Sequence, residues 1–589
     1  SSTRAWQVDG GLNFETLYGK SPYWKQMTQR FNQRARRRPF RSKTYTETVT
    51  LTAGEPKEIT HKLGSESIDV KAETKSGKTI RLRVVPVSNT KATIVSKENL
   101  KDVQITVKTK DPNLRTPAEK ALDFAAYFGT MVRKLQVTYR NTNSMTLPGF
   151  APQVGFMGQT KYNDFYAPGF DFAFGFYGDD FVEKAKREGW LSGDTTVVQP
   201  ATRSMTNDFD VKLSLEPFPG FKIQVNGKRY AAESSSIIYS FDQIQENMTG
   251  SFNITQVAIG TAFHRIGGAE ENFASDVFDN FLNYRGIMSG RVREQYDDVY
   301  YPNSQFIPSE LRGQKCDSAQ VVATNSADVL VPAFLAAYTG RDANRVGLNP
   351  FLSILQILPN WSVTFDGLGR LPWMKEHFKS VNITHAYTCK YAIGSYSSYS
   401  TWTPAATMPN QQMDGLSSNK HVGFIRDVAT GNPIPSSAYD ISSVTLSESF
   451  SPLIGVNLTM KNSLSAKVEY RKQRNVSLNI TSVQITEGHT DEFVLGAGYT
   501  IKDLSFITQS RSGTQKKVSN DLKINVDVSY KDIKTLLRKV EEDITQASSG
   551  NKVIGVKVSA DYVLSEKINL QLFYDHQGTT PLISSSYPV

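Results

Sequence analysis

The sequence lacks long apolar runs and has almost no cysteine. Its longest strongly apolar stretch, residues 329–340, has 12 residues, whereas a membrane-spanning helix needs about 20. We therefore expect no transmembrane helix. The two cysteines, Cys316 and Cys389, are too few for a disulfide framework and lack the spacing of a zinc site, so we expect free thiols.

The sequence also lacks the motifs of common catalytic sites. HExxH, the Walker A loop and the GxSxG elbow do not occur, and the seven histidines are scattered. His385 and Cys389 share a face if both lie on one strand, but no third ligand accompanies them, which favours two ordinary side chains. We expect no enzyme, no cofactor and no metal site.

Positive charge is in slight excess and is unevenly spread. The net charge of +10 lies in patches, because Lys and Arg are interleaved with Asp and Glu over most of the chain. The one dense basic run consists of Arg34, Arg36, Arg37, Arg38 and Arg41. A nucleic-acid tail is one interpretation. A solvated stretch, or a contact with anionic lipid beside a membrane, is the favoured one, so we expect no nucleic-acid partner.

Neither end of the sequence resembles the end of a complete protein. The chain begins Ser1-Ser2-Thr3-Arg4, without Met, a basic segment or an apolar leader, so it carries no targeting signal of its own. It ends Ser586-Tyr587-Pro588-Val589, after a strand pattern that these residues do not complete. We expect a fragment or a processed portion of a longer protein.

What the sequence does have is strict alternation of apolar and polar residues, which is typical of strands with one apolar and one solvated face. In 522–530 the even positions are apolar and the odd ones polar. Residues 554–564 and 568–574 repeat this pattern, with Phe573 as the exception, and 495–501 carry a fourth such segment. These segments predict strands of a transmembrane β-barrel, which hides its apolar half by alternating it with a polar half.

Two segments keep one phase over an unusual length. Residues 444–460 and 464–480 hold their apolar residues on even positions, and a one-residue slip would exchange the faces. Each segment is therefore expected to be one strand of 17 residues, against the roughly 9 to 11 that cross a bilayer. A soluble sandwich also alternates, but its strands cluster near about 5 to 6 residues. The favoured fold is all-β, a large antiparallel transmembrane barrel whose wall stands above the membrane.

Short turn signals join the predicted strands. Outer-membrane barrels keep short turns on the periplasmic side and long loops outside. On this rule 486–492 is expected to be an extracellular connection, and the short turns are Phe218-Pro219-Gly220, Lys461-Asn462-Ser463, Lys502-Asp503 and Ser565-Glu566-Lys567. Tyrosines near the predicted strand ends fit an interfacial girdle: Tyr470, Tyr499, Tyr530, Tyr562 and Tyr574.

If the apolar faces meet lipid, the polar side chains of the same strands line the lumen. Their mixed charges suit the solvated lining of a wide channel, so we expect a lining and not individual binding sites. The predicted lining residues are Lys467, Glu469, Arg471, Lys523, Asn525, Asp527, Lys557, Asp561, Asn569 and Gln571.

Composition and periodicity divide the chain into seven predicted segments. Residues 531–550 suit either a helix or a continuation of the preceding strand, and the pattern does not decide between them. The segments are a barrel strand at 1–18, a helix and basic linker at 19–43, an inserted small soluble β-domain at 44–112, a helix at 113–134, barrel strands at 135–260 with a long loop at 141–205, a helical insertion at 261–350, and barrel strands at 351–589.

Several short stretches resemble the SprA/Sov family, the outer-membrane translocon of the type IX secretion system. They are spread from residue 146 to the end of the chain, whereas residues 1–140 resemble the family in the order of their elements more than in sequence. The stretches are Thr146-Leu147-Pro148-Gly149-Phe150, Ala167-Pro168-Gly169-Phe170, Leu335-Ala336-Ala337-Tyr338-Thr339-Gly340, Leu358-Pro359-Asn360-Trp361, Asn382-Ile383-Thr384-His385-Ala386-Tyr387, Phe450-Ser451-Pro452-Leu453-Ile454-Gly455-Val456 and Leu572-Phe573-Tyr574-Asp575.

The resemblance implies a very large single-chain barrel in the bacterial outer membrane that exports folded proteins from the periplasm to the cell surface. It also implies partners: cargo with a C-terminal secretion domain, a PorV-type shuttle barrel, a plug protein, a peptidyl-prolyl isomerase-like subunit, and the lipid and lipopolysaccharide of the membrane. Family chains are far longer, so this chain would be a C-terminal portion that cannot close a barrel alone.

Two other functions remain open. A TonB-dependent or similar small-solute transporter would need a globular plug and a closed strand set, and the sequence shows neither. A soluble, β-rich adhesin of the cell surface would explain the Ser and Thr content. Dependence on detergent separates such an adhesin from a barrel.

Overall fold

The chain folds into two compact units in a computed structural model. The strand unit comprises Ser1–Glu15, Val132–Glu216 and Gly220–Val589, and the small β unit comprises Thr16–Met131 with Pro217–Pro219. The structure describes residues 1–581 except for 34–41, 66, 75–77, 110–116, 154, 157–158, 163–164, 179, 193–198, 241–242, 318–322, 410–419, 510–514 and 566–567.

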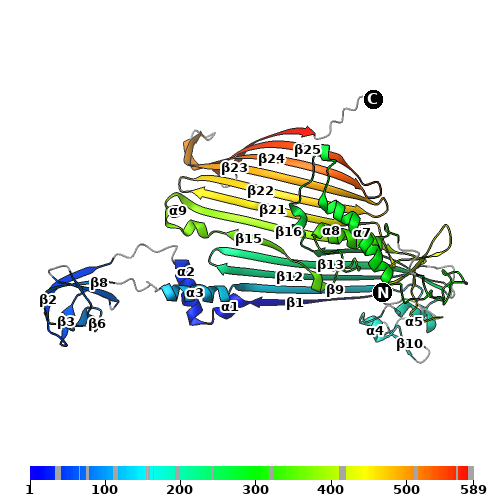
Figure 1. The fold of residues 1–589 in the computed structure, drawn as a ribbon, viewed down its shortest axis with the longest axis horizontal. Coiled ribbons are helices and arrows are strands. Elements are labelled where there is room, and N and C mark those ends of the chain that lie inside the picture. The colour runs from blue at the N-terminus through cyan, green and yellow to red at the C-terminus, as the bar shows by residue number, and fades with distance from the viewer. Residues whose placement is uncertain are drawn as a thin grey trace. The chain divides into compact units, whose positions relative to one another are not determined.

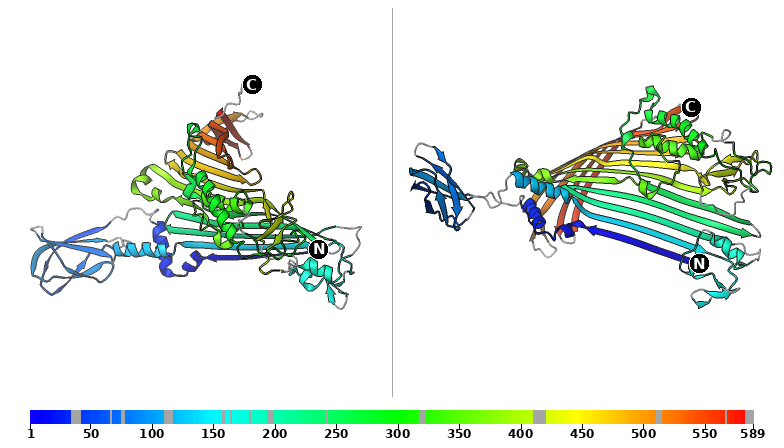
Figure 2. Two further views of the ribbon diagram at one scale, coloured as in Figure 1. Left: turned by 45° about the vertical axis from the view of Figure 1, so that its right-hand side comes forward. Right: turned by 60° about the horizontal axis from the view of Figure 1, so that its bottom comes forward.

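The strand unit is built on one large antiparallel sheet of 14 strands (Figure 1). The sheet is twisted and curved (Figure 2). Alternation forces these segments into strands, because only an extended chain places all their apolar residues on one side. In spatial order the strands are β1 (Ser2–Asn13), β9 (Val132–Thr146), β12 (Ala201–Phe218), β13 (Phe221–Ser240), β14 (Gln243–Thr255), β16 (Phe378–Ser398), β21 (Ser443–Met460), β22 (Leu464–Asn479), β23 (Gln484–Gln509), β24 (Gln515–Lys539), β25 (Ile544–Ser565) and β26 (Ile568–Pro581), with β15 (Asn360–Phe365) and β20 (Tyr439–Ile441) beside β16.

The sheet confirms the all-β prediction and the two long strands. β21 has 18 residues and β22 has 16, each in a single piece. The open alternative at 531–550 is resolved as strand, since β24 continues to Lys539 and β25 begins at Ile544. Within the described residues β1 pairs only with β9 and β26 only with β25, so both are edge strands of an open sheet.

The turn predictions are partly wrong. The turns at Phe218-Pro219-Gly220 and Lys461-Asn462-Ser463 are confirmed and lie at the same end of the sheet. Residues 486–492 are not a loop, because they lie inside β23 with partners in β22 and β24 on either side, and the connection is at 480–483. Lys502-Asp503 is not a turn either but a β-bulge within β23, with Asp503 at φ 55°.

One predicted turn, Ser565-Glu566-Lys567, falls partly outside the described residues at 566–567. The predicted long loop at 141–205 is wrong at both ends, because 141–146 and 201–207 pair within the sheet. Between them β10 (Thr160–Tyr162), β11 (Phe165–Ala167), α4 (Phe170–Ala173) and α5 (Phe181–Arg187) pack around a small core that includes Phe172, Phe181 and Trp190.

A helical insertion interrupts one strand of the sheet. β14 and β15 occupy the same position between β13 and β16, and the chain leaves after Thr255 and returns at Asn360. The two ends stay together, since the Leu358 amide donates to the Thr255 carbonyl oxygen at 3.2 Å. The insertion, residues 256–359, contains α6 (Ile259–Ala262), η2 (Ala269–Glu271), α7 (Asp276–Glu294), α8 (Ala327–Thr339) and η4 (Ile354–Gln356). Figure 1 shows α7 and α8 lying across one face of the sheet.

Shorter elements complete the strand unit. Between β15 and β16 lie η5 (Gly367–Arg370) and α9 (Pro372–His377), and after β16 a three-stranded sheet forms from β17 (Thr403–Pro404), β18 (Gly423–Arg426) and β19 (Pro433–Pro435). Among the described residues no helix is long and apolar enough to cross a membrane. Cys316 and Cys389 are both buried free thiols, as predicted.

The small β unit holds two helices and two small sheets. α2 (Pro22–Gln33), which follows α1 (Phe14–Tyr18), packs on α3 (Pro117–Gly129) around Trp24, Met27 and Tyr127. The basic run at 34–41 falls outside the described residues. One sheet comprises β2 (Thr44–Leu51), β8 (Leu100–Thr109), β4 (Ile68–Glu73) and β5 (Thr79–Ile80), and the other β3 (Pro56–Thr60), β7 (Lys91–Val95) and β6 (Arg83–Pro86).

Candidate functional site

One face of the large sheet carries an exposed apolar band. Cross-strand register decides which side chains share a face, and Val528 of β24 stands opposite Leu495 of β23 and Val556 of β25. Leu495 in turn pairs with Val468 of β22. These side chains are in contact with solvent, not packed in a core: Val468 is 50% exposed and Leu495 is 56% exposed. Soluble proteins rarely leave so continuous an apolar surface uncovered.

The band crosses the whole sheet from β1 to β26. Each strand contributes side chains of the same phase, and the paired residues follow one another from strand to strand. Its members include Val8, Leu12, Leu135, Val137, Val211, Leu213, Ile223, Val225, Val363, Phe365, Ile383, Ile454, Val456, Leu458, Val468, Leu495, Ala497, Val526, Val528, Val556, Val558, Leu570 and Leu572.

The height of the band matches a membrane. On β24 it runs from Leu522 to Tyr530, nine residues, which is about 26 Å at 3.3 Å per residue. Aromatic side chains mark one limit: Tyr470 stacks on Phe493 at 4.5 Å, and Phe493 pairs with Tyr530. Tyr499 lies near the other limit. Outer-membrane strands cross with about 9 to 11 residues, and aromatic girdles flank an apolar band about 25 Å tall.

The opposite face holds all ten predicted lining residues. Lys467, Gly496, Asp527 and Lys557 form one row across β22 to β25. Lys523, Asp561 and Gln571 form another row, across β24 to β26. The remaining predicted residues, Glu469, Arg471, Asn525 and Asn569, have the same phase on their strands.

Charges on this polar face neutralise one another locally. Lys467 and Arg471 both pair with Glu469, the lysine at 3.2 Å, and Arg471 also reaches Glu492 at 3.2 Å. At the edge Lys557 pairs with Asp575 at 3.4 Å. A surface of alternating, mutually satisfied charges presents no single strong binding position.

The insertion lies on the same face as the apolar band. It is nearer the end of the strands where residues 480–483 connect β22 to β23. Two buried arginines of the strands hold it. Arg474 of β22 donates to the carbonyl oxygens of Thr261 at 3.0 Å and Ala258 at 3.3 Å. Arg538 of β24 donates to the carbonyl oxygen of Phe273 at 3.1 Å. The insertion and the sheet are therefore joined by charge-assisted hydrogen bonds as well as by apolar contacts.

Each buried arginine has its own carboxylate on a neighbouring strand. Arg474 pairs with Glu448 at 2.9 Å, and Arg538 pairs with Glu487 at 2.8 Å. The Tyr338 hydroxyl of α8 donates to Glu487 as well. Burial raises the pKa of the Tyr338 phenol well above its usual range, and the Glu487 charge raises it further, so the phenol remains a donor.

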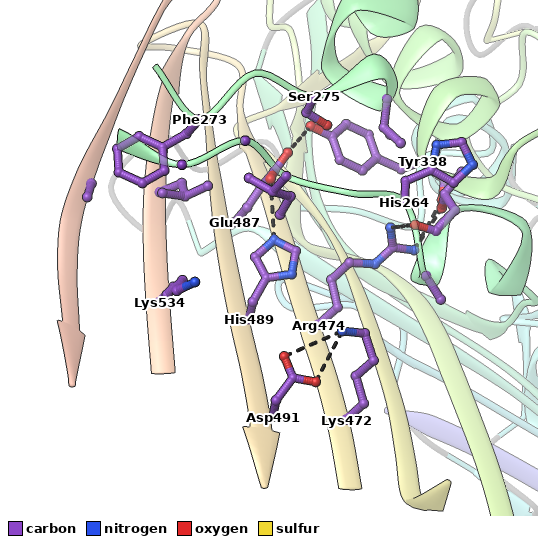
Figure 3. A pocket seen from close by; sticks show the side chains of 18 of the residues that line it. His264, Phe273, Ser275, Tyr338, Lys472, Arg474, Glu487, His489, Asp491 and Lys534 are labelled. Atoms are coloured by element: carbon purple, nitrogen blue, oxygen red, sulfur yellow. Dashed lines mark hydrogen bonds and ion pairs between the residues drawn. The ribbon is translucent and has the colours of Figure 1, made fainter. Parts of the chain in front are cut away.

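A cavity of about 630 Å³ opens between the insertion and the strands of the large sheet. Figure 3 shows Lys472, His489, Asp491 and Lys534 on the strand side of it, with Phe273 and Ser275 of the insertion facing them. Lys472 pairs with Asp491 at 3.2 Å, and His489 lies 3.4 Å from Glu487. The strand side of the cavity is therefore largely polar, with Leu536 of β24 and Ala547 of β25 as apolar members, and the insertion adds the apolar Ala262, Ile266 and Val277.

His385 and Cys389 are used structurally. The His385 Nε2 accepts from the Trp361 indole at 3.1 Å, and its Nδ1 lies 2.7 Å from the Leu453 carbonyl oxygen. Cys389 is buried opposite Glu448. In the part of the chain that the structure describes, no three His, Cys, Asp or Glu side chains gather as metal ligands would.

The buried charges at the insertion were not predicted from the sequence. Their signal is present, because Lys472 and Arg474 share the apolar phase of β22 between Tyr470 and Val476. A charge in that phase marks the place where the strand leaves the apolar band and meets another part of the protein.

Neither a protein-family model nor a curated protein sequence matches this chain.

Proposed function

We propose that this chain forms part of the wall of a large outer-membrane β-barrel that conducts folded proteins to the cell surface, as in type IX secretion. The observation that carries the membrane part is the apolar band. It is exposed, nine residues tall on β23, β24 and β25, and limited by aromatic side chains. Lipid is the surrounding that makes such a surface stable.

The open edges support a large barrel. Unpaired backbone groups are not tolerated in hydrocarbon, and within the described residues β1 and β26 each lack a second partner strand. Further strands must therefore complete the wall. A barrel with more strands than those seen here encloses a wide lumen, because the diameter grows about linearly with strand number.

The cargo part of the proposal is supported by the resemblance to the SprA/Sov family and by the polar face. Side chains of both signs, paired locally as at Lys467 and Glu469, suit the passage of unrelated protein surfaces. The partners follow from the resemblance alone: cargo with a C-terminal secretion domain, a PorV-type shuttle barrel, a plug protein and a peptidyl-prolyl isomerase-like subunit.

Two measurements test the proposal separately. When the protein is produced in its native host, it should fractionate with the outer membrane and should need detergent to stay monodisperse. A soluble adhesin would do neither. Depleting the protein should stop cargo with a C-terminal secretion domain from reaching the cell surface. If depletion instead stopped the uptake of a small solute and left cargo export intact, the result would favour a transporter.

A further inference from the structure

The cavity between the insertion and the wall lies at the depth of lipid headgroups. On the same face, two residues away from the aromatic row of Tyr470, Phe493 and Tyr530, lies a row of charged residues, Lys472, Asp491 and Asp532. Two residues of strand rise about 7 Å. The polar layer on each side of the hydrocarbon is about 5 to 8 Å thick, so these three groups fall within it. Lys534 starts two residues farther along β24, and its ammonium reaches to 3.9 Å from Asp532.

Apolar side chains of the insertion face the same level. Phe263, which is 54% exposed, lies 5.2 Å from the ring of Phe450 on β21. Leu355 is 96% exposed and neighbours Gln356, whose carbonyl oxygen accepts from Gln256 where the insertion leaves the sheet. Exposed Phe and Leu side chains just above an apolar band are suited to acyl chains and not to water.

The cationic groups of the cavity differ in how firmly they are committed. Arg474 and Arg538 are buried, and their guanidinium groups are already hydrogen-bonded to the insertion and paired with Glu448 and Glu487. The side chain of Lys534 is 47% exposed, with its ammonium 3.9 Å from Asp532. Lys472 pairs with Asp491 at the mouth of the cavity. The Lys534 ammonium can turn to a ligand because a lysine chain is long and flexible. Lys472, whose side chain is 18% exposed, can do so by giving up its pair with Asp491.

We propose that this cavity binds the phosphate of a membrane lipid, with Lys472 and Lys534 as the phosphate ligands and with the acyl chains lying on the apolar band below. The lipid reaches the cavity from the membrane itself. Asp491 and Asp532 lie beside the two lysines and would accept from hydroxyl or ammonium groups of the same headgroup. The inference rests on the proposed membrane setting of the band and adds to it one defined lipid position.

The test uses the full chain purified in detergent, with retained lipid counted by native mass spectrometry. The probe is dioleoylphosphatidylglycerol, and the comparison compounds are dioleoylglycerol, which has the tails without phosphate, and inorganic phosphate. Phosphatidylglycerol should bind to one saturable position, and dioleoylglycerol should not compete for it. Complete displacement by inorganic phosphate at equal concentration would overturn the lipid as occupant.

Lys472→Ala and Lys534→Ala are each expected to weaken phosphatidylglycerol binding about tenfold, the loss of one charge-assisted hydrogen bond. Lys467→Ala and Lys523→Ala are the matched controls, since these lysines lie on the other face of the same two strands. Both controls should bind as the parent does. Lys472→Arg and Lys534→Arg keep the charge and should restore most of the affinity even where the alanine variants fold poorly.

The failures of the two proposals are distinguishable. A chain that is monodisperse without detergent and takes up neither diacyl compound contradicts the membrane setting. A chain that needs detergent, but whose alanine variants bind phosphatidylglycerol like the parent, contradicts only the lipid position.

Discussion

The same face of β24 has two halves that differ in every respect except their phase. From Leu522 to Tyr530 the side chains on this face are apolar and uncovered, whereas from Asp532 to Arg538 they are mostly polar and increasingly buried under the insertion. Alternation fixes which side chains share a face. What lies against that face changes along a single strand, and it selects the residue types there.

The largest effect is expected in the covered half. Arg538→Ala leaves Glu487 buried without its partner, which costs about 3 to 5 kcal/mol. The midpoint of heat-induced unfolding, followed by the gel mobility of unboiled samples, should fall steeply. Arg538→Met combined with Glu487→Leu removes both charges and should recover much of the loss. An unchanged midpoint in Arg538→Ala would contradict the importance of the pair for docking.

The uncovered half is tested by a pair of neighbours. Val526→Arg places a charge on the apolar band near its middle and should reduce assembly into the outer membrane, at a cost of about 2 to 4 kcal/mol. Asp527→Arg alters the opposite face and should assemble normally. The amount of each variant in the outer-membrane fraction is the measurement, and equal effects would reject the assigned facing.

A smaller effect is expected from the phenol that joins the insertion to the wall. Tyr338→Phe removes the hydroxyl that donates to Glu487 and should cost about 1 to 3 kcal/mol, because it leaves a charged acceptor with one bond fewer. Protease cleavage in the insertion, at a rate compared with that in the sheet, reports whether the loss is local. Tyr284→Phe, on α7 of the insertion, is a control for the substitution.

The smallest effect belongs to the polar face. Lys557→Gln breaks an exposed pair with Asp575, and such pairs contribute about 0 to 1 kcal/mol. Stability and membrane assembly should stay unchanged. A large loss of either would indicate that this face packs against something and is not open to water.

Much of the sheet could be predicted, because period-2 patterns report local chain geometry directly. The strands at 444–460 and 464–480 and the shared face of the ten polar residues followed from phase alone. The error at 486–492 has a physical cause: these residues are polar, yet they stand in a strand because each has a polar partner elsewhere in the fold. Glu487 accepts from Tyr338 of the insertion, His489 lies beside Glu487, and Asp491 pairs with Lys472 of β22. No local pattern carries that information.

The candidate site was largely out of reach for the same reason. The cavity joins residues near 261–277 to strands more than 190 residues later in the chain. Single-sequence periodicity gives the face of Lys472 but not the neighbour that approaches it. The small core around Phe172 and Trp190 was missed as well, because its elements are too short to show a period.

The interrupted strand separates the register of the sheet from the insertion that it carries. Residue Arg229 of β13 stands opposite Ile254, and Asn226 stands opposite Asn360, so only two positions of β13 pass between the exit and the return of the chain. A domain grafted at such a point leaves the pairing of all other strands unaltered. The register of the large sheet is therefore independent of the length of residues 256–359, although the buried arginines Arg474 and Arg538 still need the insertion as a partner.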